Sequence, residues 1–560
     1  MENAYQREKI ADRLFNFRPF FFSGASLALG IAFAYLRIFK DVSAWWSMVL
    51  LPFAVASFCF AKGGRRVVMT AVAVVWLAAC FCFGFASFKN RVLDFTDTPQ
   101  YGGQAVVVGE VKEKTLTDYM LCVVLEDVRI DGDKQDGNLV AYLPKYRAKQ
   151  ISLADVLKLS GFVETDISFF DEYGFRGNAI SDNLRFTLTD IEDFEIIGRK
   201  FNLAAIVRGR MERVVYAGMD ETPAAVTMAV LTGNTSGIDN ELLANVRRGG
   251  IAHIFAVSGL HVGALYAFCL LLIKKTALKG LPKPVHFVLL ACVLCFYAAI
   301  CGFTASVVRA LILCLVSYSL KAIGLKNDLL ETLGLAAFLI LLFNPLQLFC
   351  VGFQLSFLAC FGIVFLAKPL GRVCNEGYRS VVLCFAGKRR ERILEREKER
   401  EDLPPSLWEE IRQATFSLLA VSLAAQITTA PVLLHTFGYV SCWAMLLNLI
   451  FVPLIGVAFS FLLLFVLAAC VLPVSAAGVI LYLPSVLWSA LLLVFEIFDF
   501  SSFLLRGFTL SAGGVICYYL ACTFASDKWN LSMRVRRICV WGLLMAFAIT
   551  TVIKNLPLIC

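Results

Sequence analysis

Charged residues are scarce in this 560-residue chain: they make up 17% of the sequence, against roughly 25% in a soluble globular protein. Hydrophobic residues make up 59%, and the mean hydropathy is +0.73. So few charged residues cannot cover the water-exposed surface of a soluble protein of this size. The composition therefore favours a polytopic membrane protein.

Several signatures of chemistry are also missing. No Walker loop or other nucleotide-binding motif occurs, so a driving force for transport would come from a partner ATPase or a gradient. Most of the 19 cysteines lie inside apolar runs, where a thiol behaves as a small hydrophobe. Cys122 stands alone in the main polar segment, so no disulfide framework is predicted there. We expect no metal site and no cofactor.

Apolar runs of about 20 residues recur along the chain, each long enough to cross a hydrocarbon core of about 30 Å. They predict roughly a dozen membrane spans, near residues 20–39, 42–61, 67–88, 251–273, 285–302, 303–324, 329–350, 351–368, 414–436, 438–472, 475–497, 509–526 and 538–555. The run at 438–472 is too long for one crossing, and Pro453 is a candidate for a break within it.

Polar segments divide these spans into blocks. The predicted parts are an N-terminal three-span membrane block (1–90), a β-rich domain (91–200), an amphipathic connector (201–250), a first membrane half (251–368), a charged cytoplasmic loop (369–413), and a second half with the C-terminal spans (414–560). In the β-rich domain, five short β-branched runs are separated by Gly, Asp and Asn turns, a pattern typical of a small barrel.

Lysine and arginine in short loops predict the orientation, because such loops favour the cytoplasmic side. Basic residues precede the first span and lie between the second and third spans: Arg7, Lys9, Arg13, Arg18, Lys62, Arg65 and Arg66. The first run lacks a small-x-small cleavage site, so we expect a retained anchor. These features predict a cytoplasmic N-terminus and place the β-rich domain at 91–200 outside the cytoplasm.

The span at 249–273, "GGIAHIFAVSGLHVGALYAFCLLLI", carries unusual polar and small residues. On a continuous helix Ser258 and His261 share a face one turn apart, and His253 lies about two turns earlier. Gly259 and Gly263 would let a neighbouring helix approach closely. Since polar groups are costly within a membrane, the cluster marks a pathway or a site rather than ordinary packing.

Arg309, two turns into the predicted span at 303–324, is a second polar residue that is costly to place in a membrane. A central arginine costs at least about 2.5–3.5 kcal/mol on insertion scales, so it should face a polar cavity, a carboxylate or helix-end carbonyls. Two further clusters hold helix breakers and amides. They contain Asn344, Pro345, Gln354 and Ser356 in the first, and Gln426, Thr428, Pro431, His435, Asn448 and Pro453 in the second. Broken, amide-bearing helices are typical of a hydrated cavity at membrane depth.

Together these clusters resemble the ComEC-type membrane competence family. The resemblance begins with an H-x-x-A-x-S-G-L-H-x-G pattern at His253, Ala256, Ser258, Gly259, Leu260, His261 and Gly263. A G-x-x-x-S-x-x-R-A span follows at Gly302, Ser306 and Arg309, then Pro345 and the G-F-Q-L-S-F motif with Gly352, Phe353, Gln354, Leu355 and Ser356. The pattern ends with Gln426, Thr429, Pro431, Asn448 and Pro453.

The resemblance implies a channel in the bacterial cytoplasmic membrane that takes up single-stranded DNA in natural transformation. It also implies an extracytoplasmic OB-like barrel, and partners that include DNA-receptor and cytoplasmic DNA-translocation proteins, with a separate nuclease. Two departures stand out. Asn234 occupies the place where the family more often has Asp. The four histidines form no H-x-H-x-D-H zinc signature, so we expect no metallo-β-lactamase-like module and no nuclease activity of this chain.

The net negative charge of the β-rich domain argues against tight DNA binding by this domain. Residues 100–198 contain 18 acidic and 10 basic residues, and such a surface repels a polyanion unless its basic groups cluster. We therefore expect this domain to gate the path or to dock a partner.

Two other functions compete with the channel. One is an intramembrane hydrolase or lipid-processing enzyme with Ser258 as nucleophile and His261 as base, although no acidic residue lies nearby to orient the histidine. The other is a small-solute or lipid transporter on a similar scaffold. If the chain is a channel, His253, Ser258, His261, Arg309, Gln354 and Gln426 line or shape the path.

Overall fold

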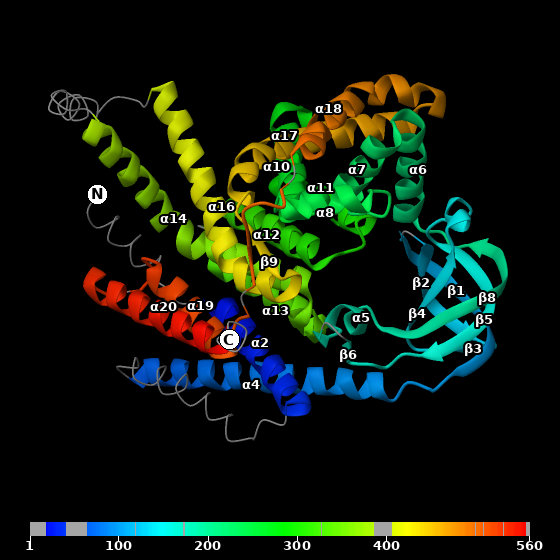
Figure 1. Cartoon of the computed structure of the whole chain (residues 1–560), viewed down its shortest axis with the longest axis horizontal. Coiled ribbons are helices and arrows are strands. Elements are labelled where there is room, and N and C mark those ends of the chain that lie inside the picture. The colour runs from blue at the N-terminus through cyan, green and yellow to red at the C-terminus, as the bar shows by residue number, and fades with distance from the viewer. Residues whose placement is uncertain are drawn as a thin grey trace.

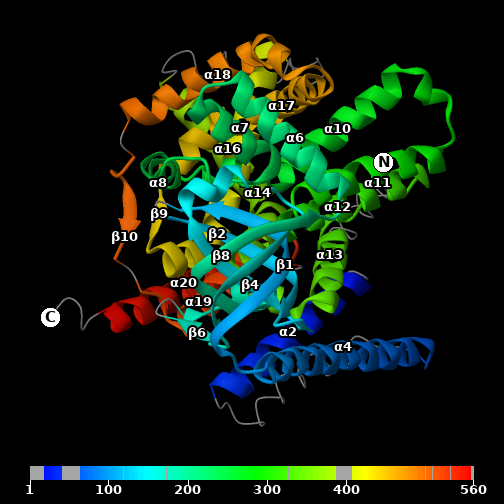
Figure 2. The same ribbon diagram turned by 90° about the vertical axis from the view of Figure 1, so that its right-hand side faces the viewer.

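A β-barrel domain stands beside a large helical body in the computed structural model (Figure 1, Figure 2). The structure describes residues 18–40, 64–385 and 406–555, apart from residues 118, 172–173, 326, 499, 508 and 530. Within these residues nine helices are long and apolar enough to cross a membrane, and two shorter apolar helices accompany them. The predicted span at 42–61 lies outside the described residues. The chain is a mostly helical, multi-pass membrane protein, as its composition predicted.

Five long strands close the barrel. They are β1 (Gly102–Leu116), β2 (Met120–Ile130), β4 (Asn138–Pro144), β5 (Asp155–Thr165) and β8 (Leu184–Arg199), and the short strand β3 (Asp133–Lys134) extends β2. Each long strand pairs with two others in the closed order β1-β2-β4-β8-β5-β1, and only the β4–β8 pair is parallel. Alternate side chains such as Val107, Val123 and Leu159 face the interior and are fully buried. The predicted OB-like barrel is confirmed.

Small connecting elements complete this domain. They are η2 (Lys145–Lys149), the hairpin β6 (Phe170–Asp171) with β7 (Gly174–Phe175), and the one-turn helix α5 (Gly177–Ser181). The N-terminal helix α4 (Gly64–Thr96) runs along the bottom edge of the helical body in Figure 1, and its end leads into the barrel. Helix α2 (Pro19–Phe39) packs between α4 and α13 (Leu329–Phe343). Glycines bring their backbones together: a Cβ atom on Gly30 would lie 2.1 Å from the carbonyl oxygen of Phe81. Such small-residue contacts are typical of membrane helix packing.

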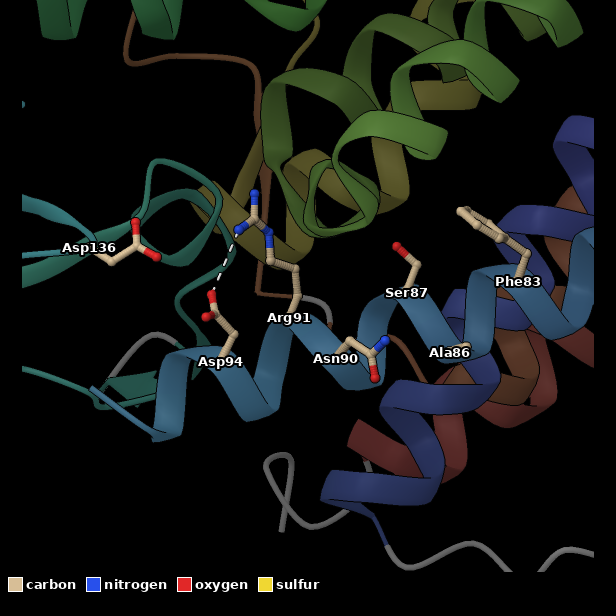
Figure 3. Close-up of a pocket in the computed structure, with 7 residues that line it drawn as sticks. All are labelled: Phe83, Ala86, Ser87, Asn90, Arg91, Asp94 and Asp136. Carbon is tan, nitrogen blue, oxygen red and sulfur yellow. Dashed lines mark ion pairs between the residues drawn. The ribbon is translucent and has the colours of Figure 1, made fainter. Parts of the chain in front are cut away.

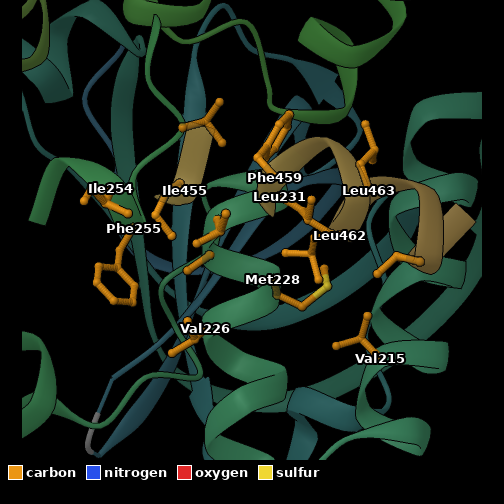
Figure 4. Packing of buried hydrophobic residues seen from close by; sticks show 14 of the residues in the cluster. Val215, Val226, Met228, Leu231, Ile254, Phe255, Ile455, Phe459, Leu462 and Leu463 are labelled. Atoms are coloured by element: carbon orange, nitrogen blue, oxygen red, sulfur yellow. The ribbon is translucent and has the colours of Figure 1, made fainter. Parts of the chain in front are cut away.

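A second group of helices surrounds the largest buried core (Figure 4). It contains α6 (Leu203–Gly218), α7 (Glu221–Thr232), α8 (Asn240–Arg248), α10 (Gly259–Lys275), α11 (Lys283–Ile300), α17 (Ala444–Val471) and α18 (Ala477–Ile497). Helix α7 is buried at every position from Pro223 to Thr232, as expected for a helix that is apolar all round. Met228 and Leu231 of α7 lie near Phe459 and Leu462 of α17 in this core (Figure 4).

The remaining elements join the two groups. They are α9 (Ala252–Phe255), η3 (Ala277–Gly280), α12 (Ala305–Ala322), η4 (Pro345–Phe349), α14 (Val351–Phe385), α16 (Leu407–Phe437), the paired strands β9 (Tyr439–Ser441) and β10 (Leu504–Arg506), η6 (Val474–Ala476), α19 (Ala512–Ala525) and α20 (Met533–Asn555). Helices α14 and α16 pack along each other: the Cβ position of Gly362 would lie 2.3 Å from the carbonyl oxygen of Ala424.

Several predicted boundaries are wrong. The stretch 251–273 forms two helices, α9 and α10, with a non-helical break between them. The run at 329–350 divides into α13 and η4. Pro453 does not break α17, because β9 and a turn take up the first residues of that run and leave one continuous helix. Helices α14 and α16 also extend into 369–413, the segment predicted as a charged loop.

Candidate functional site

The break between α9 and α10 carries the first group of predicted site residues. Ala256 has an extended backbone (φ −99°, ψ 136°), and Ser258 is the N-cap of α10 with φ −120° and ψ 172°. The prediction that Ser258 and His261 share one face of a continuous helix is therefore wrong. Their side chains meet because one residue caps the helix that contains the other.

Ser258 and His261 form a tight local pair. The Ser258 backbone N–H donates to Nδ1 of His261 over 3.0 Å, and the Ser258 hydroxyl oxygen lies 3.2 Å from the same nitrogen. Since Nδ1 accepts a backbone hydrogen bond, the neutral imidazole carries its proton on Nε2. His261 is fully buried, its ring lies 4.9 Å from the ring of Phe459, and Nε2 has no partner among the described residues.

His253 lies on the other side of the break. It belongs to the short helix α9 and is exposed, as is Ala256, whereas His261 is sealed in the core. One side of the break is thus accessible, and the other is buried.

Arg309 approaches the same break from α12. It is 6% exposed, and its Nε and Nη1 atoms have no hydrogen-bond partner among the described residues. A Cβ atom on Gly259, the first residue of α10, would lie 3.0 Å from Nη2 of Arg309. The guanidinium carbon also lies 5.7 Å from the centre of the Phe357 ring, a cation–π contact. Gly259 thus leaves room for the arginine.

Helix α14 supplies the third side. Ser356 accepts a hydrogen bond from Ser306 over 2.9 Å, and Ser306 lies one turn before Arg309 on α12. We call the set Ser258, Gly259, His261, Ser306, Arg309, Ser356 and Phe357 the Arg309 junction. It joins the starts of α10, α12 and α14. The sequence did not single out Phe357, although it is the last residue of the G-F-Q-L-S-F motif.

The other predicted residues have different positions. Gln354 donates to the carbonyl of Leu348 over 3.0 Å and so closes the turn between η4 and α14. Gln426 donates to the carbonyl of Ser441 in β9. Pro431 is buried within α16, and Asn448 donates to the hydroxyl of Ser422 over 3.1 Å. Among the described contacts, the hydrogen bonds of these residues hold helix junctions together and do not reach Arg309.

Gly263 is predicted to allow close helix packing, but a Cβ atom there would meet nothing within 4 Å of the described structure. A hollow of about 460 Å³ lies elsewhere, between α4 and the turn before β4 (Figure 3). Asp94 in this hollow pairs with Arg91 at 3.8 Å and with Arg185 at 2.6 Å. None of the predicted site residues lines it.

The barrel domain docks beside the Arg309 junction through α5, a contact that the sequence did not reveal. Asn344 and Gln347 of the break before α14 donate to the hydroxyl of Ser181 over 3.0 and 2.9 Å. A Cβ atom on Gly177 would lie 3.0 Å from both the Cβ atom and the carbonyl oxygen of Phe349. The polar residues of this break therefore bind the barrel domain.

Gly177→Val is expected to separate α5 from η4, because a branched side chain would collide with the Phe349 backbone. Overpacking of this kind costs about 1–3 kcal/mol. Hydrogen–deuterium exchange on the full-length protein should show faster exchange in α5 and η4 with unchanged protection in the barrel strands. Gly198→Val, at an open position of the same domain, is the control. Unchanged exchange in α5 would contradict this contact.

Several basic side chains of the barrel domain form ion pairs with carboxylates. Asp127 pairs with Lys134 at 2.7 Å and with Lys200 at 2.9 Å, and hydrogen bonds from Lys134 and Lys200 lower the pKa of Asp127 to about 2. Three further pairs join Arg176 to Asp166, Arg185 to Asp94 and Lys114 to Glu212. These basic groups are already engaged with carboxylates, which agrees with the weak DNA grip expected from the net charge.

Comparison with known proteins gives two matches. Residues 230–531, which contain the whole Arg309 junction, match a family described as competence protein. A protein named ComE operon protein 3, from Bacillus subtilis (strain 168), is 26% identical over 256 residues, which cover 46% of this chain and 26% of that protein. The chain thus matches about a quarter of that relative's length. No solved structure matches the chain.

Proposed function

The chain belongs to the competence protein family, and from that premise we propose that it is a cytoplasmic-membrane channel for the uptake of single-stranded DNA in natural transformation. One structural observation supports the proposal in addition to the family match. The matched region holds a buried arginine whose Nε and Nη1 atoms have no partner among the described residues, at the meeting point of three helix starts. Intramembrane charges of this kind usually mark pathways.

The chemistry of the Arg309 junction suits a polyanion with aromatic bases. A conduit for a DNA strand needs cations for the phosphates, and polar or aromatic groups for the bases. Arg309 supplies the cation, Ser306 and Ser356 supply hydroxyls, and Phe357 supplies an aromatic face. Ser258 and His261 shape the start of α10. The proposal includes no chemical reaction of this chain.

In this proposal the barrel domain lies outside the cytoplasm and controls access instead of gripping DNA. Its contacts reach Cys350, whose thiol donates to the carbonyl of Gly177 over 3.5 Å, two residues before Gly352 of the G-F-Q-L-S-F motif. A movement of α5 would therefore act directly on the start of α14. Submicromolar binding of a single strand by the barrel at physiological salt would contradict this role. The proposed partners are a DNA receptor outside, and a DNA-translocating protein and a separate nuclease.

DNA import in the native bacterium tests the proposed function. Deleting the gene is expected to reduce fluorescent DNA in the cytoplasm to background, and the wild-type gene should restore it. The DNA should still reach the cell surface in the deletion strain, since binding there precedes the channel. Normal import in the deletion strain would remove the DNA function and favour a solute or lipid transporter.

A serine hydrolase is the second candidate, because the hydroxyl of Ser258 lies 3.2 Å from Nδ1 of His261. However, that nitrogen already accepts the Ser258 backbone N–H, and α10 contains no carboxylate to orient the imidazole. A fluorophosphonate probe is expected to label wild type and Ser258→Ala equally weakly. Strong labelling of wild type alone would establish the hydrolase.

A further inference from the structure

We propose that Arg309 and the N-terminus of α10 together form a binding site for one phosphodiester group of the transported strand. This inference rests on the proposed function and gives its substrate a defined point of contact. The guanidinium has five N–H donors, yet its Nε and Nη1 atoms are buried without partners among the described residues. A buried charge without a counterion indicates that the counterion comes from outside the chain.

The neighbouring helices offer no internal counterion. Helices α10, α11, α12 and α17 contain no Asp or Glu at all, and the single acidic residue of α14 is Glu376, about five turns beyond Phe357. Helix α13 contains Glu331, whose carboxylate accepts hydrogen bonds from the backbone N–H groups of Phe20 and Phe21 in α2. No ion pair involves Arg309 among the described residues, and its charge rests against the face of Phe357. An arginine that served only to tie helices together would donate to a carboxylate or to helix-end carbonyls, and Arg309 does neither there.

The start of α10 adds a second feature that favours an anion. The first N–H groups of a helix have no partner within it, and the helix dipole makes that end positive. Nη2 of Arg309 lies beside Gly259, the first residue of this helix, 3.0 Å from the place that a Cβ atom would take. The backbone N–H of His261 already donates to the carbonyl of Ser258. Since Gly259 has no side chain, an anion held by the guanidinium can also approach the backbone N–H groups of Gly259 and Leu260.

A phosphodiester fits this arrangement because it presents two oxygens to a guanidinium fork and carries one negative charge. Arg309 is 6% exposed, so the site is sealed in this conformation. A strand reaches it only when α10, α12 and α14 move apart. When these helices close without a strand, they bury a guanidinium that lacks a counterion, which is energetically unfavourable. A phosphate that enters the site removes this cost.

Binding of short strands to the purified full-length protein tests the site. The protein is placed in phosphatidylcholine nanodiscs and offered ten-nucleotide thymidine strands with either normal or uncharged methylphosphonate linkages. Wild type should bind the normal strand at least tenfold more tightly than the neutral strand. Arg309→Gln should weaken binding of the normal strand about tenfold, the loss expected for charge-assisted hydrogen bonds, and leave binding of the neutral strand unchanged. Arg309→Lys should retain part of the preference.

Matched controls separate the site from general electrostatics. Lys279→Gln removes an equal charge at an exposed position of η3, the short helix after α10, and should leave the preference intact. An equal loss in Lys279→Gln, or an unchanged preference in Arg309→Gln, would overturn the phosphodiester site. Phosphatidylglycerol and inorganic phosphate are tested as competitors of the strand. If either anion removes all strand binding and the Arg309→Gln strain still imports DNA normally, the site binds those anions and the inference is overturned. A wild type that shows the Arg309-dependent preference but imports no DNA would disprove the channel and not the anion site.

Discussion

Replacing Arg309 with methionine is expected to make the purified protein more stable and to abolish DNA import. Methionine fills a similar elongated space without a charge. The change removes a buried guanidinium whose Nε and Nη1 atoms lack partners among the described residues, so the gain should be about 2 kcal/mol or more, by analogy with the cost of a central arginine in a membrane helix. Most substitutions in a core destabilise instead. A gain of stability with a loss of function is characteristic of a residue kept for its activity.

Thermal unfolding in detergent and DNA import in cells measure the two effects. Arg309→Lys keeps a charge at the same place, so it should show no gain in melting temperature. The opposite result for methionine, a lower melting temperature, would mean that Arg309 ties its neighbouring helices together. In that event the loss of import would follow from damage to the fold, and the anion site would lose its support.

Gly362→Val is expected to produce the largest structural damage of any single change discussed. A Cβ atom on Gly362 would lie 2.3 Å from the Ala424 carbonyl oxygen and 2.3 Å from the hydroxyl of Thr428. Both helices must move apart, because the nearest atom belongs to backbone. The cost should reach or exceed the upper end of the roughly 1–3 kcal/mol known for overpacked cores. Thr428 would also lose its 2.7 Å hydrogen bond to the carbonyl of Leu358.

The matched control is Gly377→Val on the same helix. Gly377 is exposed, and a Cβ atom there would meet nothing within 4 Å. The two variants share the loss of a helical glycine, so a difference in folded yield and melting temperature isolates the contact between α14 and α16. Equal stability of the two variants would show that these helices do not pack as described.

Composition and strand pattern were enough to predict the fold class. Apolar run length identified the membrane helices, and β-branched runs between turn residues identified the barrel. The break at 256–258 was missed because Ala256, Val257 and Ser258 do not interrupt the apolar pattern that defines a span. Only the folded chain shows that Ser258 caps α10 and that Nδ1 of His261 accepts a hydrogen bond from the Ser258 backbone N–H.

The candidate site was predicted in part. Arg309 and the Ser258–His261 pair stood out because polar groups are costly in a membrane, and the structure brings them together at Gly259. The roles of Asn344 and Gln347 were not predictable, since their partner Ser181 lies more than 160 residues away in sequence. Amides at a helix break suggested a hydrated cavity, whereas in the folded chain they hold the barrel domain.

The most direct test of the central claim asks whether imported DNA touches the Arg309 junction. Phe357 is replaced by the photo-crosslinking residue p-benzoylphenylalanine, which keeps the phenyl ring and adds a benzoyl group, and labelled DNA is supplied to irradiated cells. The same residue at Phe461, which is exposed on the apolar helix α17, is the control. The account predicts DNA adducts at position 357 and none at position 461. Normal import without adducts at 357, or equal adducts at both positions, would contradict it.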